Sequence, residues 1–122
     1  MTIPLIILLC GLSLAAATAE HNHRSDRTVT QTGTASWYGY ECSKTASGEH
    51  YNPKTLTAAH RTLPFGTMVQ VRNTANGKTA TVRINNRGPF KKGRIIDVSK
   101  AAAEQLDMIH SGTAKVELVV VH

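Results

Sequence analysis

Residues 67–84, TMVQVRNTANGKTATVRI, alternate apolar and polar side chains in two runs on either side of Asn76-Gly77. The apolar positions are Val69 and Val71 in the first run, and Ala80, Val82 and Ile84 in the second. A period of two indicates strands with one buried face, and Asn-Gly is the dipeptide that favours a tight hairpin turn. We therefore expect an antiparallel β-hairpin at the centre of the chain.

The rest of the chain adds short strands and one helix to this hairpin. The C-terminal run AKVELVVV places Val116, Leu118 and Val120 on one face and predicts a closing strand. Ser99 is a suitable N-cap for a helix over KAAAEQLDMIH, and Gly112 follows as a stop. The pattern favours a mainly β fold, a small closed barrel with one inserted short helix, because closure removes exposed strand edges.

Residues 1–19, MTIPLIILLCGLSLAAATA, are apolar and uncharged and end in the small-x-small pattern Ala17-Thr18-Ala19. This pattern predicts a signal peptide that is cleaved after Ala19. A membrane anchor is the alternative, but the run is shorter than a bilayer span and is diluted by Ser13 and Thr18. Lipidation at Cys10 is a further alternative that we disfavour, because Leu9 stands where a small residue is usual.

Residues 20–32, EHNHRSDRTVTQT, are polar without apolar periodicity and predict a flexible leader, in which His21 and His23 would form a poor metal site. One domain is then expected over residues 33–121 of this 122-residue chain. After cleavage Cys42 would be the only cysteine, so no internal disulfide is expected.

All 14 Lys and Arg residues follow the signal segment, and the net charge of +6 favours an anionic partner. A wall polymer bearing carboxylates suits an exported chain better than nucleic acid, since the basic residues are scattered and no nucleic-acid motif accompanies them. We expect no nucleic-acid partner, no cofactor, no metal and no transmembrane span in the mature form, and a monomer.

Several residue types in this pattern are typical of a carbohydrate site. Trp37 and Tyr38, with Tyr40, are suited to stack on the apolar faces of sugars, although Trp37 would equally fill a core. Glu49 and His60 are candidate acids or bases, and the alternatives are a surface carboxylate and a structural histidine.

Asp97 precedes the predicted helix, so it is a further candidate whose alternative role is to favour the start of that helix.

Five stretches in order resemble the RlpA-like (rare lipoprotein A) family: TASWYG, TASGEHYN, LTAAHRTLPFGTMVQVRN, VRINNRGPF and GRIIDVSKAAAEQL. The resemblance covers about residues 33 to 121 and implies a six-stranded double-psi β-barrel, a fold shared with expansins and family 45 endoglucanases. It also implies a peptidoglycan lytic transglycosylase, which cleaves between N-acetylmuramic acid and N-acetylglucosamine and leaves 1,6-anhydro ends. The expected location is the periplasm or cell envelope.

The resemblance assigns catalytic roles to Glu49, His60 and Asp97. It places Asn86 where the family pattern R-I-N-D-R-G-P-F has an aspartate. An amide can hold a sugar hydroxyl, but it cannot hand over a proton as a carboxylic acid can. The proton donor would then be Asp97, alone or with Glu49. The alternative is a noncatalytic, expansin-like wall-binding or wall-loosening module.

The expected substrate-binding residues complete the sequence hypothesis. Asn86 would hold a hydroxyl and Arg87 would steady negative charge on the sugar or stem peptide. The aromatic residues expected to bind substrate are Trp37, Tyr38 and Tyr51.

Overall fold

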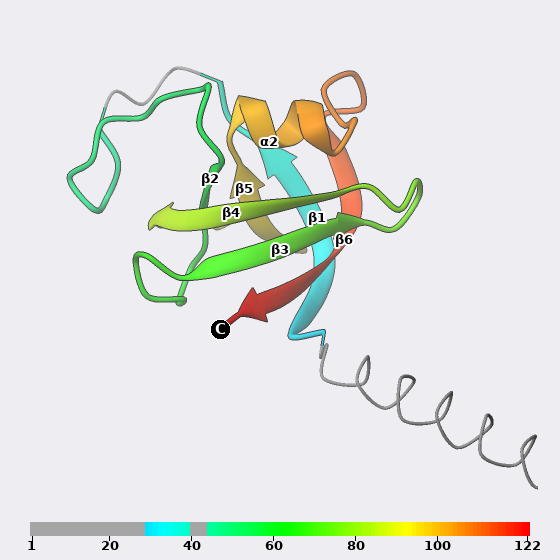
Figure 1. The fold of residues 1–122 in the computed structure, drawn as a ribbon, viewed down its shortest axis with the longest axis horizontal. Coiled ribbons are helices and arrows are strands. Elements are labelled where there is room, and N and C mark those ends of the chain that lie inside the picture. Colours follow the sequence, from blue (N-terminus) through cyan, green and yellow to red (C-terminus); the bar gives the residue numbers. More distant parts are fainter. Residues whose placement is uncertain (1–28, 40–43) are drawn as a thin grey trace, which may run out of the picture.

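The computed structural model describes residues 29–39 and 44–122, which form a closed barrel of six strands with one short helix (Figure 1). The elements are β1 (Gln31–Trp37), β2 (Thr57–Ala59), β3 (Met68–Asn73), β4 (Thr79–Asn86), β5 (Arg94–Val98), α2 (Lys100–Gln105) and β6 (Thr113–Val121). The predicted signal peptide, both leader histidines, Tyr40 and both cysteines lie outside the described residues.

The strands follow the order β1-β5-β2-β4-β3-β6 around the barrel. Two neighbouring pairs are parallel, β1 with β5 and β2 with β4, and the other four pairs are antiparallel. Strands that are distant in sequence are therefore interleaved. The mainly β, closed barrel with one short helix that the sequence predicts is confirmed.

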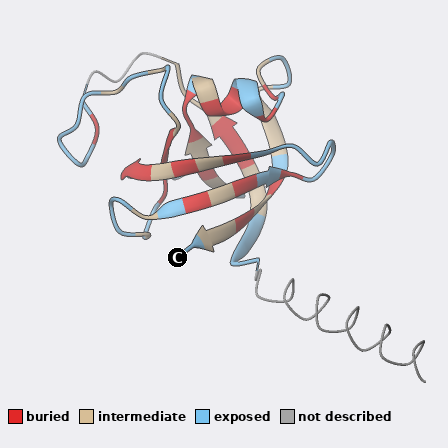
Figure 2. Ribbon diagram, viewed as in Figure 1, coloured by how far each residue is buried: buried red, intermediate tan, exposed pale blue. Residues whose placement is uncertain are grey.

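The predicted hairpin is confirmed as β3 and β4, which pair from Met68↔Arg83 to Arg72↔Thr79. Its five predicted apolar positions are all buried in the barrel core, as the alternating colours along these strands in Figure 2 illustrate. Full burial of a Val or Ile side chain contributes about 1.5–3 kcal/mol. The period-two pattern therefore fixes which face of the hairpin lines the core.

The helix begins as expected but ends earlier. The Ser99 hydroxyl caps it by accepting a hydrogen bond from the Ala102 amide at 3.3 Å. The expected helix through residue 110 is wrong, because Asp107 adopts a left-handed conformation with φ of 57°. This turn directs Met108 into the core, where it is fully buried. Burial of Met108 therefore outweighs the helical propensity of the following residues.

The barrel has two different ends. We call one of them the open end. The strand directions place the starts of β1, β3 and β5 at this end, together with the ends of β2, β4 and β6. The other, the closed end, lies beside α2 (Figure 1). There the backbone oxygen of Leu106 accepts hydrogen bonds from the side-chain amides of Asn73 and Asn76.

The barrel starts two residues before its expected beginning at Gly33. Gln31 and Thr32 belong to β1, where they pair with Leu118 and Glu117 of β6. Polar residues thus extend the strand because a partner strand supplies the hydrogen bonds, which a period-two pattern cannot reveal. Within the described part of the chain, no helix has the length and apolar character needed to cross a membrane.

Candidate functional site

Four residues from four neighbouring strands form a continuous row on the outside of the barrel, which we call the outer row. Ser36 of β1 pairs with Asp97 of β5, Asp97 pairs with Ala59 of β2, and Ala59 pairs with Asn86 of β4. Paired residues share one face of a sheet. Since Ile96, on the neighbouring position of β5, is fully buried in the core, alternation places Asp97 on the outer face. On β4 an irregularity in the register after Ile84 brings Asn86 opposite Ala59, on the same face.

The row brings together two of the residues that the sequence singled out. Asp97 and Asn86 flank Ala59 from opposite sides, so two strand spacings, or about 10 Å, separate their backbones. The Ser36 hydroxyl donates a hydrogen bond to Oδ1 of Asp97. Among the described residues, no Lys or Arg forms an ion pair with Asp97. Asp97 is therefore oriented by a neutral partner and keeps one oxygen for other groups.

The side chain of Asn86 is held in one orientation. Its Oδ1 accepts hydrogen bonds from the backbone amides of Ala46 and Arg87, both at 2.9 Å. Because two N–H groups point at Oδ1, the amide cannot be flipped, and Nδ2 remains as a donor. Asn86 thus positions the loop around Ala46 and presents N–H groups at the outer row.

The Glu49 carboxylate is held by hydrogen bonds from two side chains of β4. Arg83 donates to both carboxylate oxygens, at 3.0 and 2.8 Å, and Nδ2 of Asn85 donates to Oε1 at 2.9 Å. The hydrogen bonds from Arg83 and then Asn85 lower the pKa of Glu49 to about 2. Glu49 is therefore a permanent carboxylate at neutral pH and has no proton to donate.

The same contacts fix the loop of residues 44–50 against β4. The Ser47 amide donates to the backbone oxygen of Asn85 at 3.2 Å, beside the contact between Ala46 and Asn86. Asn85 is only 2% exposed, and its Oδ1 has no hydrogen-bond partner among residues 29–39 and 44–122. Its Nδ2 is nevertheless committed to Glu49, so Asn85 serves as a buried support for the loop.

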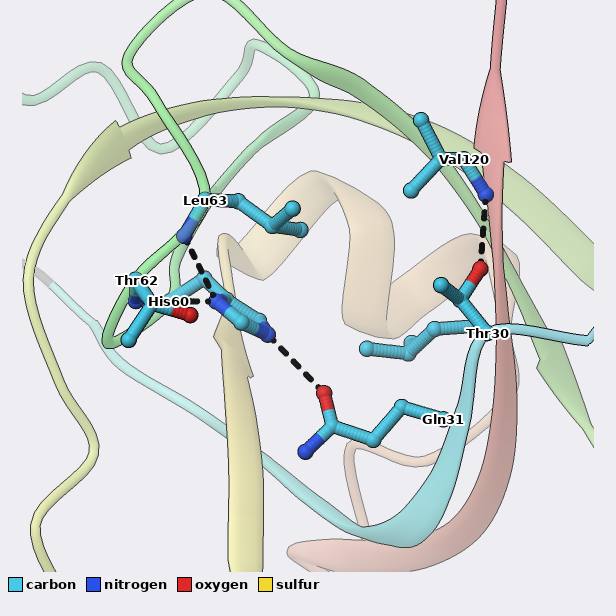
Figure 3. Close-up of a pocket in the computed structure, with 7 residues that line it drawn as sticks. Thr30, Gln31, His60, Thr62, Leu63 and Val120 are labelled. Atoms are coloured by element: carbon cyan, nitrogen blue, oxygen red, sulfur yellow. Dashed lines mark hydrogen bonds between the residues drawn. The ribbon is translucent and has the colours of Figure 1, made fainter.

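His60 points away from the outer row, into the open end of the barrel. Its Nδ1 accepts from the backbone amides of Thr62 and Leu63, both at 3.2 Å, so Nε2 carries the proton and donates to Oε1 of Gln31 at 2.9 Å (Figure 3). Burial, with the charges of Arg87 and Arg61, lowers its pKa. Both ring nitrogens are therefore occupied in a neutral imidazole.

A cavity of about 370 Å³ opens beside this histidine at the open end. His60, Gln31, Thr30 and Thr62 form its polar part, and Leu63, Leu118 and Val120 form its apolar part (Figure 3). The cavity lies in the mouth of the barrel, whereas the outer row lies on the wall. The His60 side chain thus faces the cavity, whereas its backbone amide donates to the backbone oxygen of Asn86 at 3.1 Å.

Arg87 is engaged with the protein itself. Its Nη1 donates to the backbone oxygens of His60 and Leu63, at 3.1 and 2.8 Å, and its guanidinium lies 4.1 Å from the centre of the Phe65 ring. These contacts hold the loop between β2 and β3. Arg87 therefore has a structural function whether or not it also contacts a ligand.

The aromatic residues lie at the far end of β1. Trp37 is half-buried against the core, as the alternative interpretation expected. The rings of Tyr38 and Tyr51 are 4.7 Å apart, and the Tyr51 hydroxyl donates to the backbone oxygen of Tyr38. The Lys100 amide donates to the same hydroxyl. Tyr51 thus links the end of β1 to the start of α2, next to the outer row.

Sequence reasoning missed Ser36, Arg83 and Asn85. All three stand inside the quoted motifs, but their partners are 61, 34 and 36 residues away in sequence, so only the strand register shows the contacts. The described residues contain no group of three or more His, Cys, Asp or Glu side chains placed to hold a metal ion.

Comparison with known proteins gives a consistent result. The sequence profile described as lytic transglycolase matches residues 30–118. The chain is similar to the endolytic peptidoglycan transglycosylase RlpA of Campylobacter jejuni, with 55% identity over 94 residues, covering 75% of this chain and 34% of that protein. The protein of the same name from Vibrio cholerae is 46% identical over 100 residues, covering 80% and 38%. The chain spans about a third of the length of these relatives.

Solved structures share the fold at low identity. A Streptomyces papain inhibitor matches with a TM-score of 0.61 and 21% identity, covering 79% of this chain and 99% of that one. An expansin of Clavibacter michiganensis matches with a TM-score of 0.61 and 17% identity, covering 75% and 50%. At these identities the likeness concerns the barrel alone.

Proposed function

Since the chain belongs to the lytic transglycolase family of double-psi β-barrels, we propose that it is an endolytic peptidoglycan transglycosylase that uses the outer row as its active site. The observation that carries this proposal is Asp97, a carboxylate on the outer row that no cation neutralises within the described residues. Glu49, the other carboxylate beside the row, is held ionised by Arg83.

The reaction needs one carboxyl group that acts twice. Protonated Asp97 gives its proton to the glycosidic oxygen between N-acetylmuramic acid and N-acetylglucosamine while the C1–O bond breaks. The C6 oxygen of the muramic acid residue then bonds to C1, and the Asp97 carboxylate takes the C6 hydroxyl proton. The products are a 1,6-anhydro end and a new free hydroxyl, and Asp97 returns to its protonated form.

Ser36 and Asn86 support this chemistry from either side of Asp97. The Ser36 hydroxyl orients the carboxyl group, and Nδ2 of Asn86 donates a hydrogen bond to a sugar hydroxyl or an N-acetyl oxygen. In this assignment Asn86 binds substrate and transfers no proton.

The remaining predicted residues act at the edges of the site. Tyr38 and Tyr51 flank the outer row and offer ring surface to a glycan, with Trp37 beside them. Glu49, His60 and Arg87 position loops. We propose that the protein acts on this substrate in the cell envelope, after export and as a monomer.

A second function, noncatalytic binding of wall glycan, is favoured by one observation. Asn86 stands where the family pattern has an aspartate, and its Oδ1 accepts two backbone N–H groups that would equally hold a carboxylate. An Asn86→Asp variant would therefore fit without rearrangement, and the native amide would mark a barrel that binds glycan without cutting it.

Mass spectrometry of the soluble products from sacculi stripped of stem peptides tests both functions. We compare the wild-type protein with Asp97→Asn and Asn86→Asp, and circular dichroism controls for folding. Release of 1,6-anhydro fragments by the wild type, lost in Asp97→Asn, is the expected result. Products from Asn86→Asp alone would establish the binding barrel instead.

A further inference from the structure

We propose that the open end of the barrel docks on an anionic lipid surface, an interaction that is separate from glycan cleavage at the outer row. Five large apolar side chains are exposed in the described part of the chain, and the topology brings all of them to this end. They form what we call the rim: Val29, Phe65, Met68, Phe90 and Val121.

The strand directions explain why the rim gathers at one end. Val29 precedes β1, Met68 begins β3, and Val121 ends β6, where Met68 and Val121 are paired. Phe65 lies in the loop between β2 and β3, and Phe90 lies in the loop between β4 and β5. Phe90 is 80% exposed. Exposed apolar residues gathered in this way mark an interaction surface, whereas scattered ones need no explanation.

Two arginines hold the loops of the rim together reciprocally. Arg61, in the first loop between β2 and β3, donates to the backbone oxygens of Pro89, within the second loop between β4 and β5, and Arg94, which directly follows that loop. Arg87, in the second loop, donates to the backbone oxygens of His60 and Leu63 in the first. The loops are therefore fixed in place before any partner arrives, which lowers the entropic cost of docking.

The charge around the rim selects the partner. The two loops, residues 60–67 and 87–93, contain four basic residues and no Asp or Glu. Lys91 and Lys92 follow Phe90 directly, are exposed, and form no ion pair within the described residues. Lysine ammonium groups beside an inserted aromatic ring match the headgroup layer of an anionic membrane.

A fluid surface fits this shape better than a folded protein or a glycan. The rim side chains come from separate strand ends and loops at the same end of the barrel as the cavity beside His60 and Gln31. A bilayer conforms to separate apolar tips, whereas a protein partner must match them and the cavity at that end. Phenylalanine, unlike tyrosine or tryptophan, has no polar group to satisfy sugar hydroxyls.

Cosedimentation with lipid vesicles tests the proposal. The chain that begins at Glu20 is used, because the apolar residues 1–19 would insert into any vesicle by themselves and all described residues follow them. Vesicles of phosphatidylcholine with phosphatidylglycerol are compared with vesicles of phosphatidylcholine alone. We expect binding to the anionic vesicles only, weakened by high salt.

Two variants and a matched control locate the contact. Phe90→Ser should weaken vesicle binding about 10-fold, and Lys91→Gln with Lys92→Gln should weaken it about 10-fold or more. The control is Lys54→Gln with Lys100→Gln, which removes the same charge from exposed residues next to the closed end. It should change binding less than about 2-fold.

Three results would overturn the proposal. The first is no binding of the wild type to anionic vesicles. The second is an equal loss of vesicle binding in the Lys54→Gln, Lys100→Gln control, which would show that net charge alone accounts for the binding. The third is loss of pelleting with wall sacculi in the Phe90→Ser variant without vesicle binding, which would assign the rim to glycan. None of these depends on glycan cleavage, so the proposed transglycosylase can fail or succeed independently.

Discussion

Asp97 on β5 and Glu49 beside β4 are both carboxylates of the family motifs, but their contacts in the fold are opposite in kind. Among the residues that the structure describes, the Asp97 carboxylate receives a single hydrogen bond, from the Ser36 hydroxyl. Glu49 receives three, two of them from the Arg83 guanidinium. One carboxylate is oriented and left accessible to a reaction, and the other is consumed in holding a loop. The difference teaches that a carboxylate in a family motif can donate a proton only if no cationic side chain of the fold holds it in the ionised form.

His60 belongs with Glu49 in this comparison. Its two ring nitrogens are occupied by Thr62, Leu63 and Gln31. We therefore divide the motif residues into a reacting group on the outer row and supports that position the surrounding loops. Four predictions, ordered from the largest effect to the smallest, test this division.

The largest expected effect is on catalysis at Asp97. Asp97→Asn should lower the rate of anhydro-product release about 100-fold or more, because general acid–base catalysis typically contributes that much. Urea unfolding should change little, since an amide still accepts the Ser36 hydrogen bond. Equal rates in the variant and the wild type would remove Asp97 from the mechanism.

A substitution at His60 should act on stability. His60→Ala should lower the free energy of unfolding by about 2 kcal/mol, because it removes an almost fully buried ring and leaves the amides of Thr62 and Leu63 without an acceptor. Urea denaturation measures this loss. If His60 instead takes part in the chemistry, a variant that remains folded will lose activity with no change in the midpoint.

The ion pair of Glu49 and Arg83 should contribute less. Because both side chains are partly exposed, a double-mutant cycle of Glu49→Gln and Arg83→Gln should give a coupling of about 0.5–1 kcal/mol. The exchanged pair, Glu49→Arg with Arg83→Glu, separates the two interpretations of Glu49. It should recover activity relative to either single variant if Glu49 only positions the loop, and it should stay inactive if the carboxylate at position 49 reacts.

The smallest expected effect is a pH dependence from His60. Burial and the charges of Arg87 and Arg61 lower its folded pKa, so the folded protein favours the neutral ring. Its contribution to stability is complete above the unfolded pKa, near 6.5, and is lost as the pH falls through the lowered folded pKa. Urea midpoints between pH 8 and pH 5 should decline in the wild type and decline less in His60→Gln.

Glu49 does not interfere with that measurement. Its contribution is complete above the unfolded pKa, near 4.5, and is lost as the pH falls from there through the folded pKa of about 2, below the measured range. A urea midpoint that rises as the pH is lowered from 8 to 5 would contradict the assignment of His60 as a neutral ring.

Local patterns in the sequence predict much of the fold. The Asn76-Gly77 turn and the alternating valines predict the hairpin, and Ser99 predicts the start of the helix. The end of the helix could not be predicted, because Met108 turns inward to fill a space that strands from elsewhere in the chain create. Periodicity reports which face of an element is apolar, but it does not report what the rest of the barrel places opposite.

The candidate site divides in the same way. Linked motifs bring attention to Glu49, His60, Asp97 and Asn86, but their contacts arise from register. Parallel pairing aligns Ser36 with Asp97, and β4 directs Arg83 toward Glu49. Sequence therefore predicts which residues matter, whereas only the barrel shows which of them have partners.

The pairing of the first strand with the last has a consequence for how the protein is made. Gln31 of β1 pairs with Leu118 of β6, so the barrel cannot close until the residues through β6 are available. Such long-range pairing gives a high contact order, which slows folding. A barrel delivered from its N-terminal side, by the ribosome or through a membrane channel, therefore stays unclosed until β6 has been delivered. The same topology that assembles the outer row delays its assembly until the last strand of the barrel arrives.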